Sequence, residues 1–331
     1  MSNRIIITCT LLLALMGFLA RSAEAQMGTP TVLQLDETSL VNYNEDVVDS
    51  TKIATSSAIT NIATLPTFQH GVGLGDIVAV NGQAAKGTHV LRFTKLNASP
   101  TPATGQVIAD ITRDALLFHF WEIQGEDGTP IGSIMAQGFS RGTPPPGAPS
   151  VQTAANLAIT GGTGAFAGVR GFAGSTNPPG SVANRQASSL EDPSYRRTNK
   201  GGSGSYILTL YPAESRQILA IAHSDFSLVS AAKPATAGET LVLIANGLGP
   251  TRPAVEPGQP FPSSTLLAVN SPVGVTINGT AAKVLAAVGY PGATNGYQVN
   301  FQVPPSTAKG TAQVQLSAAW MAGPAVTMNV Q

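Results

Sequence analysis

The chain has 331 residues with 18 basic and 18 acidic side chains, so its formal net charge is zero. A neutral chain without a basic tract lacks the electrostatic footprint of a nucleic-acid-binding protein, so no nucleic-acid partner is expected. Only 11% of the residues are charged, but 43% are apolar, which excludes general disorder and provides for a buried core.

The first 26 residues have the pattern of an export signal. Arg4 supplies a positive charge, an apolar run extends from Ile5 to Leu19, and Ala23-Glu24-Ala25 is a cleavage site of the A-x-A type. The run is short for a membrane-spanning helix, which needs about 20 residues; an uncleaved anchor is the competing interpretation. We predict cleavage after Ala25 or Gln26 and a mature chain without a membrane span, which is secreted, periplasmic or held at the cell surface.

Cysteine and histidine usage excludes several kinds of site. The only cysteine is Cys9, inside the predicted signal, so the mature chain has no disulfide, cysteine nucleophile or zinc–thiolate site. The histidines His70, His89, His119 and His223 lack the spacing of metal ligands. We therefore expect no metal and no cofactor.

The mature chain shows the two-residue alternation of strands and no persuasive helical period over 12 residues. In its first part, strands are predicted at Thr88–Thr94, Gln106–Thr112, Ala115–Ile123, Gly132–Phe139, Asn156–Thr160 and Ser205–Tyr211. A polar segment at 174–204 interrupts this series and carries several basic residues. Loops of that length are usually either functional or disordered, and disorder is the favoured interpretation of this one.

A second unit is predicted from about Phe226 to the end of the chain. Its strands are expected at Thr240–Ala245, Val273–Ile277, Lys283–Val288, Gly296–Val303, Ala312–Ser317 and Val326–Val330. Short strands at this spacing, separated by Asn-Gly turns, are typical of a β-sandwich. Pro212-Ala213-Glu214-Ser215 reads as a linker, so segments 27–214 and 226–331 are expected to fold separately.

A glycine-rich segment in the first unit carries a family resemblance. The run Ile159-Thr160-Gly161-Gly162-Thr163-Gly164-Ala165-Phe166, followed by Arg170-Gly171, resembles a segment of dirigent proteins and allene oxide cyclases. The resemblance covers about residues 75–212 and implies an eight-stranded antiparallel β-barrel. The glycines favour a barrel corner over a phosphate-binding loop, because no helical pattern follows them.

The second unit resembles an immunoglobulin-like domain of the TIG/IPT type that ends many secreted proteins of acidobacteria. The resemblance rests on Ala245-Asn246-Gly247-Leu248-Gly249-Pro250-Thr251, on Pro257-Gly258-Gln259-Pro260 and on Gly296-Tyr297-Gln298-Val299-Asn300. It implies a spacer or an adhesive surface and no activity. The expected architecture is therefore all-β, with an eight-stranded antiparallel barrel followed by an immunoglobulin-like β-sandwich.

Candidate site residues are few. His119 and Glu122 lie on opposite faces of the strand predicted at Ala115–Ile123, so only one of them can face a barrel lumen. The residue that faces inward would act as acid or base beside Arg141 or Gln137 of the next strand. The remaining candidates are Asp76 as a catalytic group and Trp121 as a ligand contact. The plainer interpretation is that His119 packs in the barrel wall and Glu122 is solvated.

Three functions are compatible with these features. The favoured one is an exported two-domain protein that binds a small apolar ligand or interacts with a surface glycan or protein. The first alternative is a cyclase-like or dirigent-like enzyme that acts in the barrel cavity. The second alternative is a purely structural or adhesive surface protein. The sequence does not establish an enzyme, and the small number of catalytic candidates favours binding.

Overall fold

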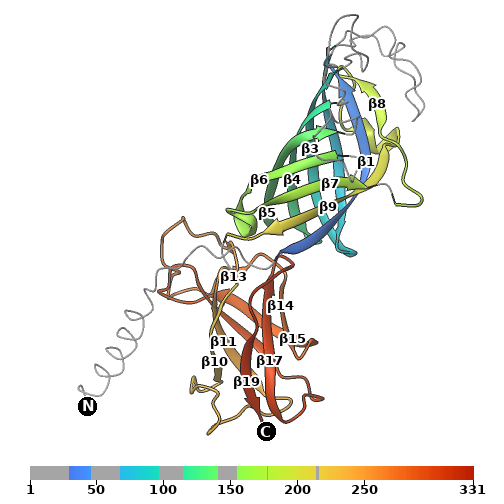
Figure 1. Cartoon of the computed structure of the whole chain (residues 1–331). Helices are drawn as coiled ribbons and strands as arrows, with labels where there is room; N and C mark the ends of the chain where they lie inside the picture. Colours follow the sequence, from blue (N-terminus) through green and yellow to red (C-terminus); the bar gives the residue numbers. More distant parts are fainter. Residues whose placement is uncertain (1–29, 46–67, 97–114, 141–154, 177, 214–215) are drawn as a thin grey trace, which may run out of the picture.

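The computed structural model describes residues 30–45, 68–96, 115–140, 155–176, 178–213 and 216–331. This part of the chain is almost wholly β, as predicted, and it forms a barrel and a second curled sheet (Figure 1). None of its helices is long and apolar enough to cross a membrane. The predicted signal segment lies outside the described residues, so export stays a prediction.

Eight antiparallel strands form the closed barrel that the sequence predicted. They are β1 (Thr31–Asn44), β2 (Phe68–Val80), β3 (Gln83–Leu96), β4 (Ala115–Gly125), β5 (Pro130–Ser140), β6 (Ala155–Gly162), β7 (Arg170–Thr176) and β9 (Gly202–Tyr211). The barrel closes because β1 pairs with β9 along one edge and with β2 along the other. Five of the predicted strands lie within β3, β4, β5, β6 and β9, whereas 106–112 lies outside the described residues.

Strand alternation places an apolar layer inside the barrel. Along β4, Leu117, Trp121 and Ile123 are buried in the core, whereas Phe118 and Phe120 are exposed on the outside. The other strands contribute mainly leucine, isoleucine and alanine to the same core. An eight-stranded barrel is just wide enough for its own side chains or for one small ligand, so each inward position matters.

The segment between β7 and β9 is folded against the barrel. It contains β8 (Arg185–Ser188), which pairs in parallel with the end of β1, and the short helix α2 (Tyr195–Thr198). The glycine-rich segment turns the corner between β6 and β7 through a short 3-10 helix, Gly164–Phe166. Gly164 has φ of 59°, and an added Cβ would collide with the carbonyl oxygen of Ile131, so the corner requires glycine.

The second sheet has its strands in the order β10-β11-β16-β15-β14-β17-β18, with β12, β13 and β19 attached. These strands are β10 (Ile218–His223), β11 (Thr240–Asn246), β12 (Thr251–Arg252), β13 (Ala268–Val269), β14 (Val273–Ile277), β15 (Thr280–Gly289), β16 (Gly296–Gln302), β17 (Gly310–Ala318), β18 (Met321–Ala322) and β19 (Val326–Val330). All six predicted strands have a counterpart here. The unit begins earlier than the predicted residue 226, because β10 already pairs with β11.

The turn between β17 and β18 packs into one end of the barrel (Figure 1). Ala319 and Met321 are part of the barrel's hydrophobic core, and Trp320 Nε1 donates a hydrogen bond to Gln83 Oε1 at 3.0 Å. Ala319 and Trp320 have φ values of 49° and 62°, a costly conformation for residues with a side chain. The two units share a hydrophobic core at this turn, so we expect the stability of the barrel to depend on the second sheet.

Replacing Met321 by alanine tests this dependence. Truncation of a buried methionine costs about 2–5 kcal/mol, so Met321→Ala should lower the free energy of unfolding of the barrel by about that amount. The measurement is urea unfolding followed by tryptophan fluorescence. Leu285→Ala on β15 is the control, because Leu285 is 48% exposed and should change the value by less than about 0.5 kcal/mol. Equal stability of Met321→Ala and the parent chain would contradict a shared core.

Candidate functional site

Five side chains meet inside the barrel and form what we call the polar cluster. Its members are Glu37 on β1, His89 on β3, His119 and Trp121 on β4, and Tyr206 on β9. Glu37, His89 and His119 are each at most 3% exposed, which is unusual for such side chains unless they are hydrogen-bonded.

Hydrogen bonds connect these residues into a chain. His89 Nδ1 lies 2.8 Å from Glu37 Oε2, and His89 Nε2 lies 2.8 Å from His119 Nδ1. Trp121 Nε1 donates to the other carboxylate oxygen, Glu37 Oε1, at 3.0 Å. The chain ends at His119 Nε2, which is buried and has no hydrogen-bond partner among the described residues. A buried polar atom of this kind calls for an explanation.

Aromatic packing fixes the orientation of the rings. The rings of His89, His119 and Trp121 stack with centroids 5.0–5.2 Å apart, and Tyr206 meets all three edge-on at 5.0–5.3 Å. Such contacts add about 0.5–1.5 kcal/mol per pair beyond burial. The partly buried Tyr206 also packs against the barrel core, so these ring contacts join the polar cluster to the apolar interior.

Burial also determines the charge states of the ring groups. Removal from water, and to a smaller degree the neighbouring His89, lower the pKa of His119 well below its ordinary value, so this imidazole is neutral. Burial likewise raises the pKa of Tyr206, so its hydroxyl stays protonated. A neutral imidazole has one N–H and one bare nitrogen, and its hydrogen bonds decide which is which.

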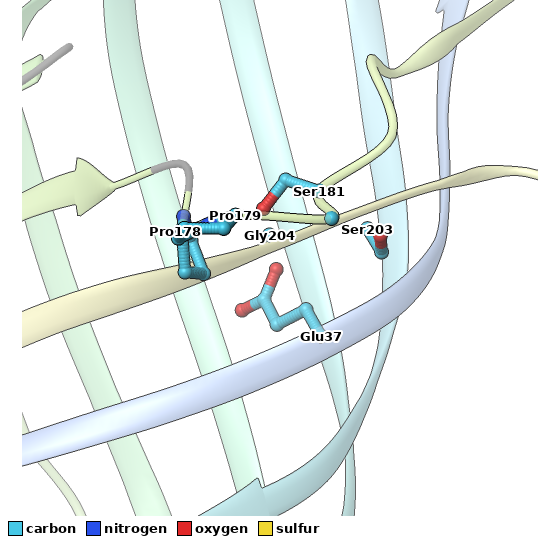
Figure 2. Close-up of a pocket in the computed structure, with 7 residues that line it drawn as sticks. Glu37, Pro178, Pro179, Ser181, Ser203 and Gly204 are labelled. Atoms are coloured by element: carbon cyan, nitrogen blue, oxygen red, sulfur yellow. The ribbon is translucent and has the colours of Figure 1, made fainter.

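A pocket of about 210 Å³ opens to solvent above Glu37. Its lining residues are Glu37, Pro178, Pro179, Gly180, Ser181, Ser203 and Gly204 (Figure 2). The stretch 178–181 is held beside β9, where the Ser203 amide donates to the Val182 carbonyl at 2.8 Å. The first member of the hydrogen-bonded chain therefore borders an open pocket although its side chain is fully buried, and the last member lies in the barrel interior.

A group of ion pairs on the outer surface, which we call the latch, holds α2, the short helix in the segment between β7 and β9. Arg196 and Arg197, on α2, both donate to the Asp76 carboxylate on β2 at 2.6–2.8 Å. Burial by itself would raise the pKa of Asp76, but the hydrogen bonds and charges of Arg197 and Arg196 outweigh it and lower that pKa. Asp76 therefore lies outside the barrel lumen and anchors α2, which belongs to the segment that also lines the pocket.

The structure separates the residues proposed from the sequence. It places His119 and Trp121 inside the barrel in the polar cluster. Glu122 and Gln137 are exposed on the outer surface of the barrel, away from the lumen, because they occupy the outward positions of their strands. Asp76 is likewise on the outside, in the latch. Arg141 lies outside the described residues, so its expected place beside the site is not addressed.

Sequence reasoning missed Glu37, His89 and Tyr206 as members of the site. Each occupies an inward position that continues an apolar series, as in Leu33-x-Leu35-x-Glu37 and His89-x-Leu91-x-Phe93. The available signal was therefore a polar residue on the apolar face of a strand. Among the described residues, no group of three or more His, Cys, Asp or Glu side chains is arranged to hold a metal ion.

Comparison of the chain with protein-family models, with curated proteins and with solved structures found no match.

The lowered pKa of His119 predicts a pH dependence of stability. The unfolded chain takes up a proton below the ordinary histidine value of 6.5 while the folded chain does not, so the free energy of unfolding should fall as the pH decreases from there. The slope approaches about 1.4 kcal/mol per pH unit. Urea unfolding between pH 5 and 8 measures it, and His119→Gln should flatten the curve.

That measurement is made in a His223→Gln variant, so that the pH dependence contributed by His223 is removed. A hydrogen bond with Glu239 raises the pKa of His223, so this residue contributes stability that is lost as the pH rises, opposite in sign to His119. The same pH slope with and without His119→Gln in this background would contradict a neutral, buried His119.

The latch predicts a local effect of Asp76→Asn. Loss of the carboxylate removes the charged acceptor of two arginines, which should destabilise α2 by about 1 kcal/mol. Hydrogen exchange at the Asn199 amide, which donates to the Tyr195 carbonyl, reports on this opening. Glu45→Gln, in an exposed pair with Arg92, is the control and should leave exchange at α2 unchanged. Faster exchange in both variants would argue against a specific latch.

Proposed function

We propose that the barrel binds a small, mainly apolar molecule and that His119 Nε2 recognises its one hydrogen-bonding group. The observation that carries this proposal is the buried, unpartnered nitrogen at the end of the Glu37–His89–His119 chain. The surrounding rings of Trp121 and Tyr206 supply apolar surface of the kind that lines small-molecule sites.

A purely structural role for the polar cluster explains these observations less well. Replacing a buried polar network by apolar side chains of similar volume is often neutral or stabilising, so a barrel filled only for stability has little need of one. A network that leaves one atom unpaired is less favourable still. The unpaired nitrogen is therefore better explained as a group kept for a ligand.

The second sheet and the predicted signal complete the proposal. The predicted export signal supports a secreted, periplasmic or surface location, where the barrel would meet ligands from outside the cell. The resemblance of the second sheet to immunoglobulin-like TIG/IPT domains supports a spacer, or a surface that contacts a glycan or another protein. A purely adhesive protein has less support, because adhesion requires nothing from the buried cluster.

An enzyme of the cyclase-like or dirigent-like type is the second candidate. A carboxylate hydrogen-bonded to an imidazole is an arrangement that general acid–base catalysis uses, which favours this alternative. Binding remains the first choice because every catalytic scheme at this site begins with a ligand at His119.

Native mass spectrometry of the mature chain, purified from its own host without denaturant, tests the proposal. We expect a small-molecule adduct on the parent chain and its loss in His119→Leu. Glu122→Gln is the matched control, because Glu122 lies on the same strand but faces outward, and it should keep the adduct. A bare mass for the parent chain, also after incubation with apolar extracts, or an adduct that survives His119→Leu, would overturn the proposal.

A further inference from the structure

The hydrogen-bonded chain through the polar cluster has a direction, and two patterns of protons fit its distances. In the first, one proton is shared between Glu37 and His89, His89 Nε2 donates to His119 Nδ1, and His119 Nε2 therefore carries a hydrogen. In the second, both imidazoles are neutral beside a charged Glu37, His119 Nδ1 donates to His89 Nε2, and His119 Nε2 is bare.

Charge decides between the two patterns. The second leaves an uncompensated carboxylate in the apolar barrel, with Glu37 only 3% exposed. The arginines of the segment between β7 and β9 are engaged elsewhere, Arg185 with Glu191 and both Arg196 and Arg197 with Asp76. A buried charge without a partner is strongly unfavourable, whereas the first pattern makes the Glu37–His89 pair neutral overall.

We infer that His119 Nε2 is a hydrogen-bond donor and that the barrel selects a neutral ligand with an acceptor oxygen, such as a ketone. This inference rests on the proposed ligand site and specifies what that site accepts. An ammonium group has only donors and no acceptor, so it cannot accept a hydrogen bond from the N–H of His119. A carboxylate would bring an uncompensated negative charge into the apolar interior, because the Glu37–His89 pair is already neutral overall. Glu37 thus acts as a positioning residue, which sets the polarity of an atom two hydrogen bonds away.

The effect of Glu37→Gln follows from Trp121. Trp121 Nε1 can only donate, so the oxygen of the new amide must face it and the NH₂ group must face His89 Nδ1. His89 then donates from Nε2 to His119 Nδ1, and His119 Nε2 again carries the hydrogen. The inferred pattern therefore survives Glu37→Gln, whereas the alternative pattern would be reversed by it.

Nitrogen-15 NMR of the imidazole rings in the full mature chain tests the direction without any ligand. We expect a protonated His119 Nε2 in the parent chain and in Glu37→Gln, and a mixture of tautomers in Glu37→Leu, which leaves His89 Nδ1 unpartnered. The His119 signals are assigned by their absence in His119→Gln. A bare Nε2 in the parent chain that becomes protonated in Glu37→Gln would overturn the inference.

A panel of similar probes tests the ligand class: acetophenone, ethylbenzene, benzoate and benzylamine, each titrated against Trp121 fluorescence in a Trp320→Phe background. One hydrogen bond to His119 should make acetophenone bind roughly tenfold more tightly than ethylbenzene. This preference should persist in Glu37→Gln and in the outer-surface control Glu122→Gln, and shrink in Glu37→Leu. Tighter binding of benzylamine or benzoate would overturn the ligand class.

The two tests fail separately. If the NMR result is as expected but neither acetophenone nor any other probe binds, the proposed ligand site is wrong, while the inferred direction of the hydrogen bonds from Glu37 to His119 stands. The parent chain could instead bind acetophenone no more tightly than ethylbenzene, or the tenfold preference for acetophenone could persist in Glu37→Leu. In either case the binding function stands and the proposed role of Glu37 is wrong.

Discussion

The pairing of β1 with both β2 and β9 is the constraint on which the barrel and its site depend. β1 changes register against β2 between Asp36 and Glu37 and again between Thr38 and Val41. On its other edge it pairs with β9 up to Leu40 and with β8 from Val41 onward. Irregularities of this kind re-aim side chains. Glu37 lies at the first of them and lines the pocket together with the stretch 178–181. The strand pairing that closes the barrel is therefore also what brings Glu37 to the polar cluster.

The fold was predictable where each strand carries its own signal. Alternation along β4 separates buried Leu117 and Trp121 from exposed Phe118 and Phe120, and the sequence alone identifies this strand. β2 could not be identified in the same way, because three of its inward positions are glycines. An added Cβ at Gly75 would meet the Leu40 side chain of β1, so the reason for this glycine lies on another strand.

The site was less predictable than the fold for a related reason. His119 and Trp121 lie on one strand, two residues apart, so their common inward face can be read locally. Glu37, His89 and Tyr206 come from three other strands, and they meet only after the barrel has closed with its particular register. The loop that lines the pocket beside Glu37 lies in the polar segment 174–204, whose composition favoured disorder although the structure folds β8 and α2 from it.

Concentrating polarity in one layer of an otherwise apolar barrel has a specific consequence. Both carboxylate oxygens of Glu37, both nitrogens of His89 and one nitrogen of His119 are engaged with one another or with Trp121. The hydrogen-bonding capacity of these buried ring and carboxylate atoms is thereby reduced to a single unpartnered atom, His119 Nε2. Stacked rings hold this atom in place, so the protein loses little conformational freedom when a molecule binds to it. The carboxylate at the other end of the chain is buried as well, with its side chain 0% exposed, and it lies next to the residues that line the open pocket. Two imidazole rings thus connect the buried carboxylate beside the pocket to the one unpartnered nitrogen in the apolar interior.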